Sequence, residues 1–375
     1  MLLSATPEGL QRAGEALRNG QLVAFPTETV YGLGANALDA KALLSIFQAK
    51  GRPLTDPLIV HVPTVADALA LVQLDAKGTR MFETLADAFW PGPLTLIAPA
   101  IPALPREVSA NTGFVGLRIP RHPVAQALLK EAKVPVAAPS ANRFGHVSPT
   151  TAQHVVNDLG TYAGGLHVID DDGIPCCEVG IESTVAKLVP ETNQLLIFRR
   201  GGVSEAALHQ VLNIERGLAI DIVHAQRIVA DHSTVNQVAP GQLLTHYAPD
   251  VDTYMVELDG LEAAISPRPE MKQWVILDFH ERLAALQDAV AAYKDLSPTY
   301  DDTTTNKRTN DRPDERNRGD VAAAATTVFD ALRWAELVPG ATRILIPDVS
   351  DVPQEHAAAL HDRLFRAASG KRTPV

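Results

Sequence analysis

The stretch VAFPTETVYGLGANALDAKALLSIFQAKGRP (Val23–Pro53) runs from a short apolar segment through a polar turn into a helix-like segment. Asp39 stands where a side-chain N-cap is expected, and Gly51 stands where a left-handed residue commonly ends a helix. A strand, a turn and a capped helix in succession predict an α/β fold.

Lys50 and Arg52 flank Gly51, so a sharp turn at the glycine directs both cations to the same side. Two adjacent cations suit a polyphosphate, with lysine as a compact charge and arginine as a bidentate fork. Cations near the end of a helix also complement the helix dipole without any ligand. Both interpretations stay open for this pair taken alone.

Strand and helix patterns alternate outward from this stretch, beginning with a helix that Thr6 is expected to cap. They predict a first domain with a mixed sheet over residues 1–212. Residues 213–249 have little periodicity and are interpreted as an interdomain linker. Residues 250–375 predict a second, smaller α/β domain, in which RLAALQDAVAAY is expected to be a helix. Residues near 296–320 are polar and are expected to form a mobile loop.

The net charge of −11 gives no overall attraction to nucleic acid or to an anionic membrane. An anionic ligand therefore requires a local basic cluster. Prolines interrupt the apolar runs, and the first residues lack the pattern of a signal peptide, so we expect a cytoplasmic protein with no membrane partner. The only two cysteines, Cys176 and Cys177, exclude a disulfide framework. Two small residues in a turn are the favoured interpretation of this pair over a vicinal redox switch.

A second group of polar residues lies in PSANRFGHVSPT, after the predicted strand VPVAA. Ser140 and Asn142 follow the strand, and Ser148 is expected to be the N-cap of a helix that ends at Gly160. Hydroxyls and free N–H groups at such a helix start can bind an anion. Ser, Asn and Gly also form turns without any ligand, so both interpretations stay open.

Arg118 lies within the otherwise apolar strand pattern GLRIP. A buried unpaired charge is costly, so we expect either the carboxylate of a ligand or a structural Asp beside it. GIESTV places Glu182, Ser183 and Thr184 at the start of another strand, and FRRGG adds Arg199 after a further one.

No metal-binding motif of the C-x-x-C or H-E-x-x-H type occurs, and the histidines are scattered, so no protein metal site is expected. Neither a Walker loop nor a G-x-S-x-G elbow is present. If ATP binds, it binds without the common phosphate loop.

Eight motifs follow one another along the chain: PTETVYGLGA, KGRP with DPLIVHV, PGPLT, GLRIPRHP, APSAN with SPT, GIESTV, FRRGG and PGQLLTHYAP. In this order they resemble the YrdC/Sua5 family, the threonylcarbamoyl-AMP synthases of tRNA t6A biosynthesis, over roughly residues 8–250. The resemblance implies a YrdC-like domain with a twisted mixed sheet and a smaller Rossmann-like C-terminal domain of the Sua5 type.

The resemblance also implies a reaction, in which L-threonine, bicarbonate and ATP with Mg²⁺ give threonylcarbamoyl-AMP and pyrophosphate. A threonine carbamate attacks the α-phosphorus of ATP, and no covalent nucleophile on the protein is needed. The implied acceptor is a transferase complex of t6A synthesis, and tRNA is contacted only indirectly.

Site residues are implied by position within the matching motifs. The residues implied for catalysis are the Lys-x-Arg and Ser-x-Asn pairs, namely Lys50, Arg52, Ser140 and Asn142. Those implied for ATP binding are these four together with Asp56, Ser148, Arg199, His246 and Tyr247. Those implied for threonine are Thr29, His61, Arg118, Ala138 and Ser183. Asp56 stands where an Asn is common, FRRGG replaces Arg-Pro-Gly, and the expected lid around His246 lacks a basic residue before it.

Two other functions remain as alternatives. The first is a YrdC-like module that binds RNA without catalysis, which the acidic balance disfavours. The second is another carbamoyl-transfer enzyme, although no zinc-finger or acylphosphatase-like domain is seen in the sequence.

Overall fold

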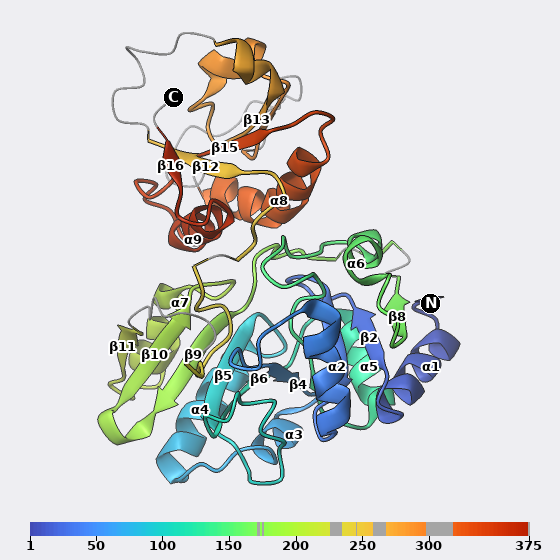
Figure 1. The fold of residues 1–375 in the computed structure, drawn as a ribbon. Helices are drawn as coiled ribbons and strands as arrows, with labels where there is room; N and C mark the ends of the chain where they lie inside the picture. The colour runs from blue at the N-terminus through green and yellow to red at the C-terminus, as the bar shows by residue number, and fades with distance from the viewer. Residues whose placement is uncertain are drawn as a thin grey trace, which may run out of the picture. The chain divides into compact units, whose positions relative to one another are not determined.

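The computed structural model describes residues 1–170, 173–174, 176–225, 235–244, 246–257, 268–297 and 318–373. The chain divides into two compact units (Figure 1). Unit 1 comprises Met1–Phe144 and Ser148–Leu243, and unit 2 comprises Gly145–Val147 and Leu244–Val375. Each unit is described by itself.

Unit 1 is built on a mixed sheet. Within the described residues its strand order is β1-β8-β2-β3-β7-β4-β6-β5-β9-β10-β11. The strands are β1 (Leu2–Leu3), β2 (Leu22–Phe25), β3 (Gly32–Asn36), β4 (Ile59–His61), β5 (Leu94–Pro99), β6 (Phe114–Arg118), β7 (Val136–Ala137), β8 (Leu166–Ile169), β9 (Thr184–Val189), β10 (Gln194–Arg199) and β11 (Asp221–His224). The sheet contains parallel pairs such as β4–β6 and antiparallel pairs such as β5–β6, which confirms the expected mixed sheet.

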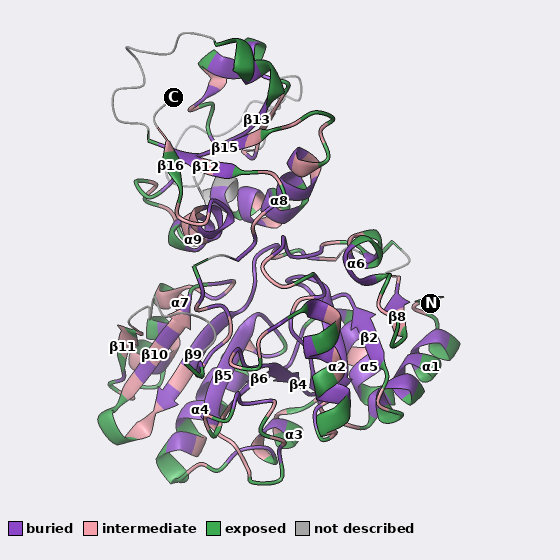
Figure 2. Ribbon diagram, in the orientation of Figure 1, coloured by how far each residue is buried: buried purple, intermediate pink, exposed green. Residues whose placement is uncertain are grey.

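The helices of unit 1 cover both faces of this sheet. They are α1 (Pro7–Arg18), α2 (Ala40–Lys50), α3 (Val65–Leu69), α4 (Ala76–Phe89), α5 (Pro123–Ala132), α6 (Ala152–Leu159) and α7 (Glu205–His209), with a short 3₁₀ turn at Pro190–Thr192 and a π-helical turn at Gln210–Glu215. In β2, Leu22 and Ala24 join the core beneath α2 and α4, whereas Val23 and Phe25 join the core beneath α1 and α5. This is the two-residue period of a strand that is buried on both sides. Figure 2 shows buried residues along the central strands of this unit.

Local signals fixed several helix ends as the sequence predicts. Thr6 Oγ1 accepts from the N–H of Gly9 and caps α1, and Asp39 accepts from two N–H groups and caps α2. Gly51 ends α2 with φ 64°, the left-handed conformation that favours glycine.

The expected cap at Ser148 is wrong. Helix α6 begins at Ala152, and Thr151 is its N-cap, with Oγ1 accepting from the N–H of His154. Ser148 instead donates its hydroxyl to Glu182 Oε1 at 2.9 Å. A tertiary partner from a distant segment therefore decided between two hydroxyl residues that local preference treats alike.

Unit 2 holds a parallel sheet with the order β14-β13-β15-β12-β16 among its described residues. The strands are β12 (Thr253–Val256), β13 (Trp274–Asp278), β14 (Ala292–Asp295), β15 (Arg343–Pro347) and β16 (Arg372–Thr373); the helices are α8 (Arg318–Glu336) and α9 (Ala357–Ala367), with 3₁₀ helices at Pro269–Gln273 and Ala284–Ala289. The α/β character expected for this region is confirmed. Residues 298–317, most of the expected polar loop, lie outside the described residues.

The predicted helix over RLAALQDAVAAY is confirmed only as a short 3₁₀ helix, and the end of the segment is a strand instead. A 3₁₀ helix at Ala284–Ala289 gives way to strand β14, which pairs in parallel with β13 from Val275 to Asp278. Backbone pairing with a buried strand thus outweighs the helix preference of an alanine-rich segment. In the described part of the chain, no helix combines the length and the apolar character needed to cross a membrane.

Candidate functional site

The end of α2 places two buried cations. The side chain of Lys50 donates from Nζ to the backbone carbonyls of Ser140 and Asn142. Burial holds the pKa of Lys50 well below its usual value, and the charge of Arg52 lowers it further. Lys50, the last residue of α2, therefore points toward the loop that carries the Ser-x-Asn pair.

Arg52 is fixed by main-chain oxygens and by one acid. Its Nε donates to the carbonyl of Asp56 at 3.1 Å, and its Nη2 donates to the carbonyl of Pro57 at 2.7 Å. Arg52 Nη2 also lies 3.0 Å from Asp56 Oδ1. Burial raises the pKa of Asp56, although the charges of Arg52, Lys50 and Arg199 oppose that rise. One carboxylate therefore lies within the field of three cations.

Arg199, at the end of β10, is the third of these cations. Its Nε and Nη2 donate to the carbonyl of Ser183 at 3.1 and 3.0 Å, and Nη2 also donates to Ser183 Oγ at 3.1 Å. The neighbouring Arg200 is 45% exposed and pairs with Glu205 at 2.7 Å. Of the two arginines, the structure thus places Arg199 with the basic cluster.

The Ser-x-Asn loop is held together by its own polar atoms. Ser140 Oγ donates to Asn142 Oδ1, and Asn142 Nδ2 donates to the carbonyl of Arg143 at 2.7 Å. The N–H of Arg143 donates to Asp158 Oδ2 at 3.3 Å, and the charge of Asp158 acts on Lys50. This loop and the end of α2 form one connected network.

Arg118 ends β6 and has an acidic partner in the protein, which is Glu28 rather than the Asp that was one of the two alternatives. Arg118 Nη2 donates to Glu28 Oε1 at 2.7 Å and to Thr29 Oγ1 at 3.0 Å, and Nε donates to the carbonyl of Gly92 at 3.3 Å. Burial by itself raises the pKa of Glu28, but the charge and hydrogen bond of Arg118 leave that pKa below its usual value. Glu28 is therefore the ionised partner of a buried arginine.

His61, at the end of β4, is a neutral neighbour of this pair. Burial lowers the pKa of His61 to about 3, and the charge of Arg118 adds to the decrease. Its Nδ1 lies 3.2 Å from the carbonyl of Ile59, and that carbonyl also accepts from the N–H of Ala138 at 2.8 Å. His61 and Ala138 are thus joined through one carbonyl.

Hydroxyl pairs complete this part of unit 1. Thr29 Oγ1 lies 2.9 Å from Thr27 Oγ1, and Ser183 Oγ lies 2.8 Å from Thr95 Oγ1. Since Ser183 also receives Arg199, it connects the hydroxyls to the basic cluster. All the residues implied for threonine, and all those implied for ATP except the His-Tyr pair, lie in unit 1.

His246 and Tyr247 belong to unit 2. Their rings meet edge to face with centroids 4.0 Å apart, and Tyr247 packs against Phe329 of α8 at 5.2 Å. Tyr247 has φ 66°. A contact of either ring with a nucleotide stays a prediction.

The sequence did not reveal the roles of three acids that contact residues of the candidate site, namely Glu28, Asp158 and Glu182. Glu28 could have been suspected from its place between two threonines in PTET, but its partner lies 90 positions away in the chain. Asp158 lies on the helix α6 pattern, where nothing distinguishes it from a solvated acid.

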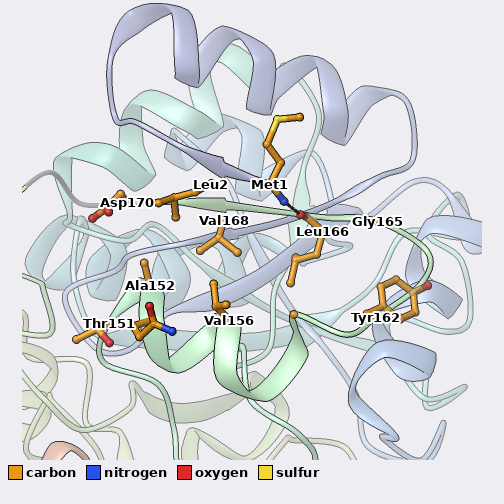
Figure 3. Close-up of a pocket in the computed structure, with 12 residues that line it drawn as sticks. Met1, Leu2, Thr151, Ala152, Val156, Tyr162, Gly165, Leu166, Val168 and Asp170 are labelled. Carbon is orange, nitrogen blue, oxygen red and sulfur yellow. Dashed lines mark hydrogen bonds between the residues drawn. The ribbon is translucent and has the colours of Figure 1, made fainter.

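A pocket of about 770 Å³ lies elsewhere in unit 1, between α6 and the β1–β8 edge of the sheet. Figure 3 shows Ala152 and Val156 on one side of it, facing Leu2 and Val168. None of the residues predicted to bind ATP or threonine lines this pocket.

One group of possible metal ligands occurs among the described residues, namely His146, Asp250 and Glu336 of unit 2. Glu336 Oε2 lies 3.0 Å from His146 Nε2 and accepts from the N–H of Asp250 at 3.0 Å. The two hydrogen bonds join the three residues through Glu336, and the one to Asp250 uses its main-chain N–H.

Two family models match the chain and together span most of it. The Sua5–YciO–YrdC model, described as "Telomere recombination", matches residues 15–201. The model described as "Threonylcarbamoyl-AMP synthase, C-terminal domain" matches residues 203–369.

Curated relatives agree with these models. A threonylcarbamoyl-AMP synthase of Bacillus subtilis is 41% identical over 248 residues, which are 66% of this chain and 66% of the relative. One of Pyrococcus abyssi is 40% identical over 64% of this chain and 66% of the relative, so the matched part spans just under two thirds of both relatives. A putative threonylcarbamoyl-AMP synthase of Mycobacterium tuberculosis is 37% identical over 55% of this chain and 90% of its own length.

Solved structures extend the likeness over the whole chain. Pyrococcus abyssi Sua5 complexed with L-threonine superposes with a TM-score of 0.78 at 29% identity, covering 100% of this chain and 99% of that one. A variant of Pyrococcus abyssi Sua5 with a consecutive His and Tyr replaced by alanines gives a TM-score of 0.77 at 29% identity, covering 100% and 98%. The chain therefore belongs to the Sua5/YrdC family of threonylcarbamoyl-AMP synthases.

Proposed function

We propose that this chain is an L-threonylcarbamoyladenylate synthase, which makes threonylcarbamoyl-AMP and pyrophosphate from L-threonine, bicarbonate and Mg-ATP. The names of the relatives and the L-threonine in the similar Pyrococcus structure support the reaction class. The observation that carries the proposal is the buried cluster of Lys50, Arg52 and Arg199 in a chain whose net charge is −11.

ATP is assigned to this basic cluster. Attack of a carbamate oxygen on the α-phosphorus places negative charge on the transferring phosphorus and on the departing pyrophosphate. Fixed cations in a buried site stabilise such charge far more than they would in water. Ser140, Asn142 and Ser148 supply polar groups for phosphate or ribose oxygens, and Mg²⁺ enters with the nucleotide as part of the substrate.

Threonine is assigned to the neighbourhood of Arg118. Among the described residues, no hydrogen bond reaches the Nη1 of this arginine, whereas Nε and Nη2 are engaged. A guanidinium has five N–H donors, so two remain on Nη1 for the carboxylate of a ligand. Neutral His61 adds no positive charge that would disfavour a cationic amine before it becomes a carbamate.

The remaining roles concern exclusion of water and transfer of the product. The adenylate is labile, so closure of His246 or Tyr247 over the nucleotide would protect it from water. Threonine's reaction precedes any contact with tRNA, and a cytoplasmic transferase of t6A synthesis is the expected acceptor.

The test uses purified protein with Mg-ATP and bicarbonate, with and without L-threonine. Pyrophosphate release is followed with time, and threonylcarbamoyl-adenylate is sought promptly by mass spectrometry. Both products should require threonine and bicarbonate. ATP binding without either product would refute catalysis, and salt-dependent RNA binding would then be measured as the alternative.

A further inference from the structure

Cys176 and Cys177 lie in unit 1 with their sulfur atoms 2.9 Å apart. This is closer than non-bonded heavy atoms usually approach, about 3.5–4.0 Å between carbons. Cys177 is buried with φ 59°, and Cys176 is half-buried. The sequence favours the interpretation that these are two small residues in a turn. That interpretation does not explain why the two sulfurs face each other.

The cysteine pair contacts the backbone of the PTET turn. The N–H of Cys177 donates to the carbonyl of Thr27 at 3.1 Å, and Cys176 Sγ donates to the same carbonyl at 3.6 Å. Two residues further on, the N–H of Val179 donates to the carbonyl of Glu28 at 2.9 Å. The segment that carries the cysteines thus lies against the turn that holds Glu28.

The second thiol reaches a different segment. Cys177 Sγ donates to the carbonyl of Thr150 at 3.7 Å, beside the loop that leads into α6. The two S–H groups therefore each hold a main-chain carbonyl of unit 1, and both segments carry residues of the proposed substrate site.

We propose that Cys176 and Cys177 form a reversible vicinal disulfide when they meet a peroxide. The thiolate of half-buried Cys176 attacks one peroxide oxygen, which gives a sulfenic acid and releases water or hydroxide. The sulfur of Cys177 then attacks the sulfenic sulfur, the S–S bond forms, and the sulfenic oxygen leaves as water. In total, two S–H groups lose two electrons and two protons, and one H₂O₂ becomes two H₂O.

The bond is expected to be easily reduced. The Cα atoms of neighbouring residues are about 3.8 Å apart across a trans peptide, whereas disulfides usually span about 4.4–6.8 Å. A disulfide outside that range is strained, and strained disulfides are the labile ones. A dithiol reductant should therefore restore the pair.

Oxidation alters the segment that lies against the PTET turn. Both S–H protons are lost, so neither sulfur can donate to Thr27 or Thr150 any longer. The loop that positions Glu28, and through it Arg118, loses support. The expected effect on activity rests on the proposed function. Because two weak hydrogen bonds are removed, the KM for threonine should be about fivefold higher, with little change in kcat.

The first test needs no activity. Hydrogen peroxide is added to the full chain, and intact mass is measured before and after addition of dithiothreitol. Because the chain has no other cysteine, the wild type should lose two hydrogens and regain them on reduction. Cys176→Ser and Cys177→Ser should show no such loss. Oxygen adducts or disulfide-linked dimers of the wild type in place of the internal bond would overturn the proposal.

The second test measures threonine-dependent pyrophosphate release by the same samples. Cys176→Ser keeps a hydroxyl donor toward Thr27 and should match reduced wild type with and without peroxide. An oxidised wild type whose KM for threonine is unchanged would refute the effect on the site. Absence of turnover in the reduced wild type would instead refute the proposed function, and the mass measurement would still decide whether the disulfide forms.

Discussion

The adjacent arginines Arg199 and Arg200 give a matched test of the basic cluster. Replacing Arg199 by alanine should lower turnover by about 10²–10³, as removal of a preorganised group that stabilises transition-state charge typically does. The same replacement at Arg200 should change turnover by no more than a few fold. The two variants remove the same side chain from neighbouring positions and differ in where that side chain points.

The expected difference follows from their surroundings. Arg199 is 7% exposed and within the field of Arg52 and Asp56. Loss of its charge removes about 2.7–4 kcal/mol of transition-state stabilisation. Arg200 is 45% exposed and pairs with Glu205. Exposed ion pairs of this kind contribute about 0.2–1 kcal/mol to the stability of the fold, and they do not act on the transition state.

The assay is pyrophosphate release at saturating threonine and bicarbonate with varied Mg-ATP. Thermal unfolding of each variant shows whether it is folded, since Arg199 also holds Ser183. Arg199→Lys, which keeps the charge but not the fork, should retain more turnover than the alanine variant. Equal losses for the Arg199 and Arg200 alanine variants, or near-normal turnover of folded Arg199→Ala, would refute the assignment of the cluster.

Three further predictions use the same assay or unfolding measurements. Lys50→Ala and Arg52→Ala should each lower turnover by about 10²–10³, and near-normal turnover of correctly folded variants would exclude a role in charge stabilisation. Arg118→Ala should chiefly raise the KM for threonine, and an unchanged threonine dependence would contradict the assignment of its Nη1. The pKa of His61 is lowered to about 3, so the unfolded chain takes up a proton near pH 6.5 that the folded chain refuses until about pH 3. Stability should therefore fall as the pH decreases through that window, by about 1.4 kcal/mol at pH 5.5 for this one group. Urea unfolding should show that the free energy of unfolding of wild type, relative to that of His61→Asn, decreases by this amount between neutral pH and pH 5.5, and a difference that does not change with pH would refute the assignment.

Features that depend on neighbouring residues could be predicted from the sequence. The caps at Thr6 and Asp39 and the left-handed Gly51 follow from preferences that act within one helical turn. The mixed sheet of unit 1 and the α/β character of unit 2 follow from the alternation of patterns.

Features that depend on distant residues could not be predicted. Ser148 and Thr151 are both suitable caps, and the choice was made by Glu182, which engages Ser148 from another segment. Strand β14 begins inside an alanine-rich segment that was expected to be helical, because β13 offers a backbone to pair with. The need for an acid beside Arg118 was predictable, but its identity as Glu28 requires knowing that β6 ends beside the PTET turn.

The structure also explains how an acidic chain can keep a concentrated positive charge. Lys50, Arg52 and Arg199 all donate to main-chain carbonyls, those of the Ser-x-Asn loop, of residues 56–57 and of Ser183. Carbonyls satisfy the donors of a buried cation without cancelling its charge, which a carboxylate would do. Asp56 feels all three cations and Asp158 acts on Lys50, so carboxylates offset part of the positive charge while carbonyls satisfy the donors. Burial and Arg52 hold the pKa of Lys50 low, and a polyphosphate beside it would reverse that shift. The cluster is therefore most stable as a set of three cations when an anion is bound, which is the property that an ATP site requires.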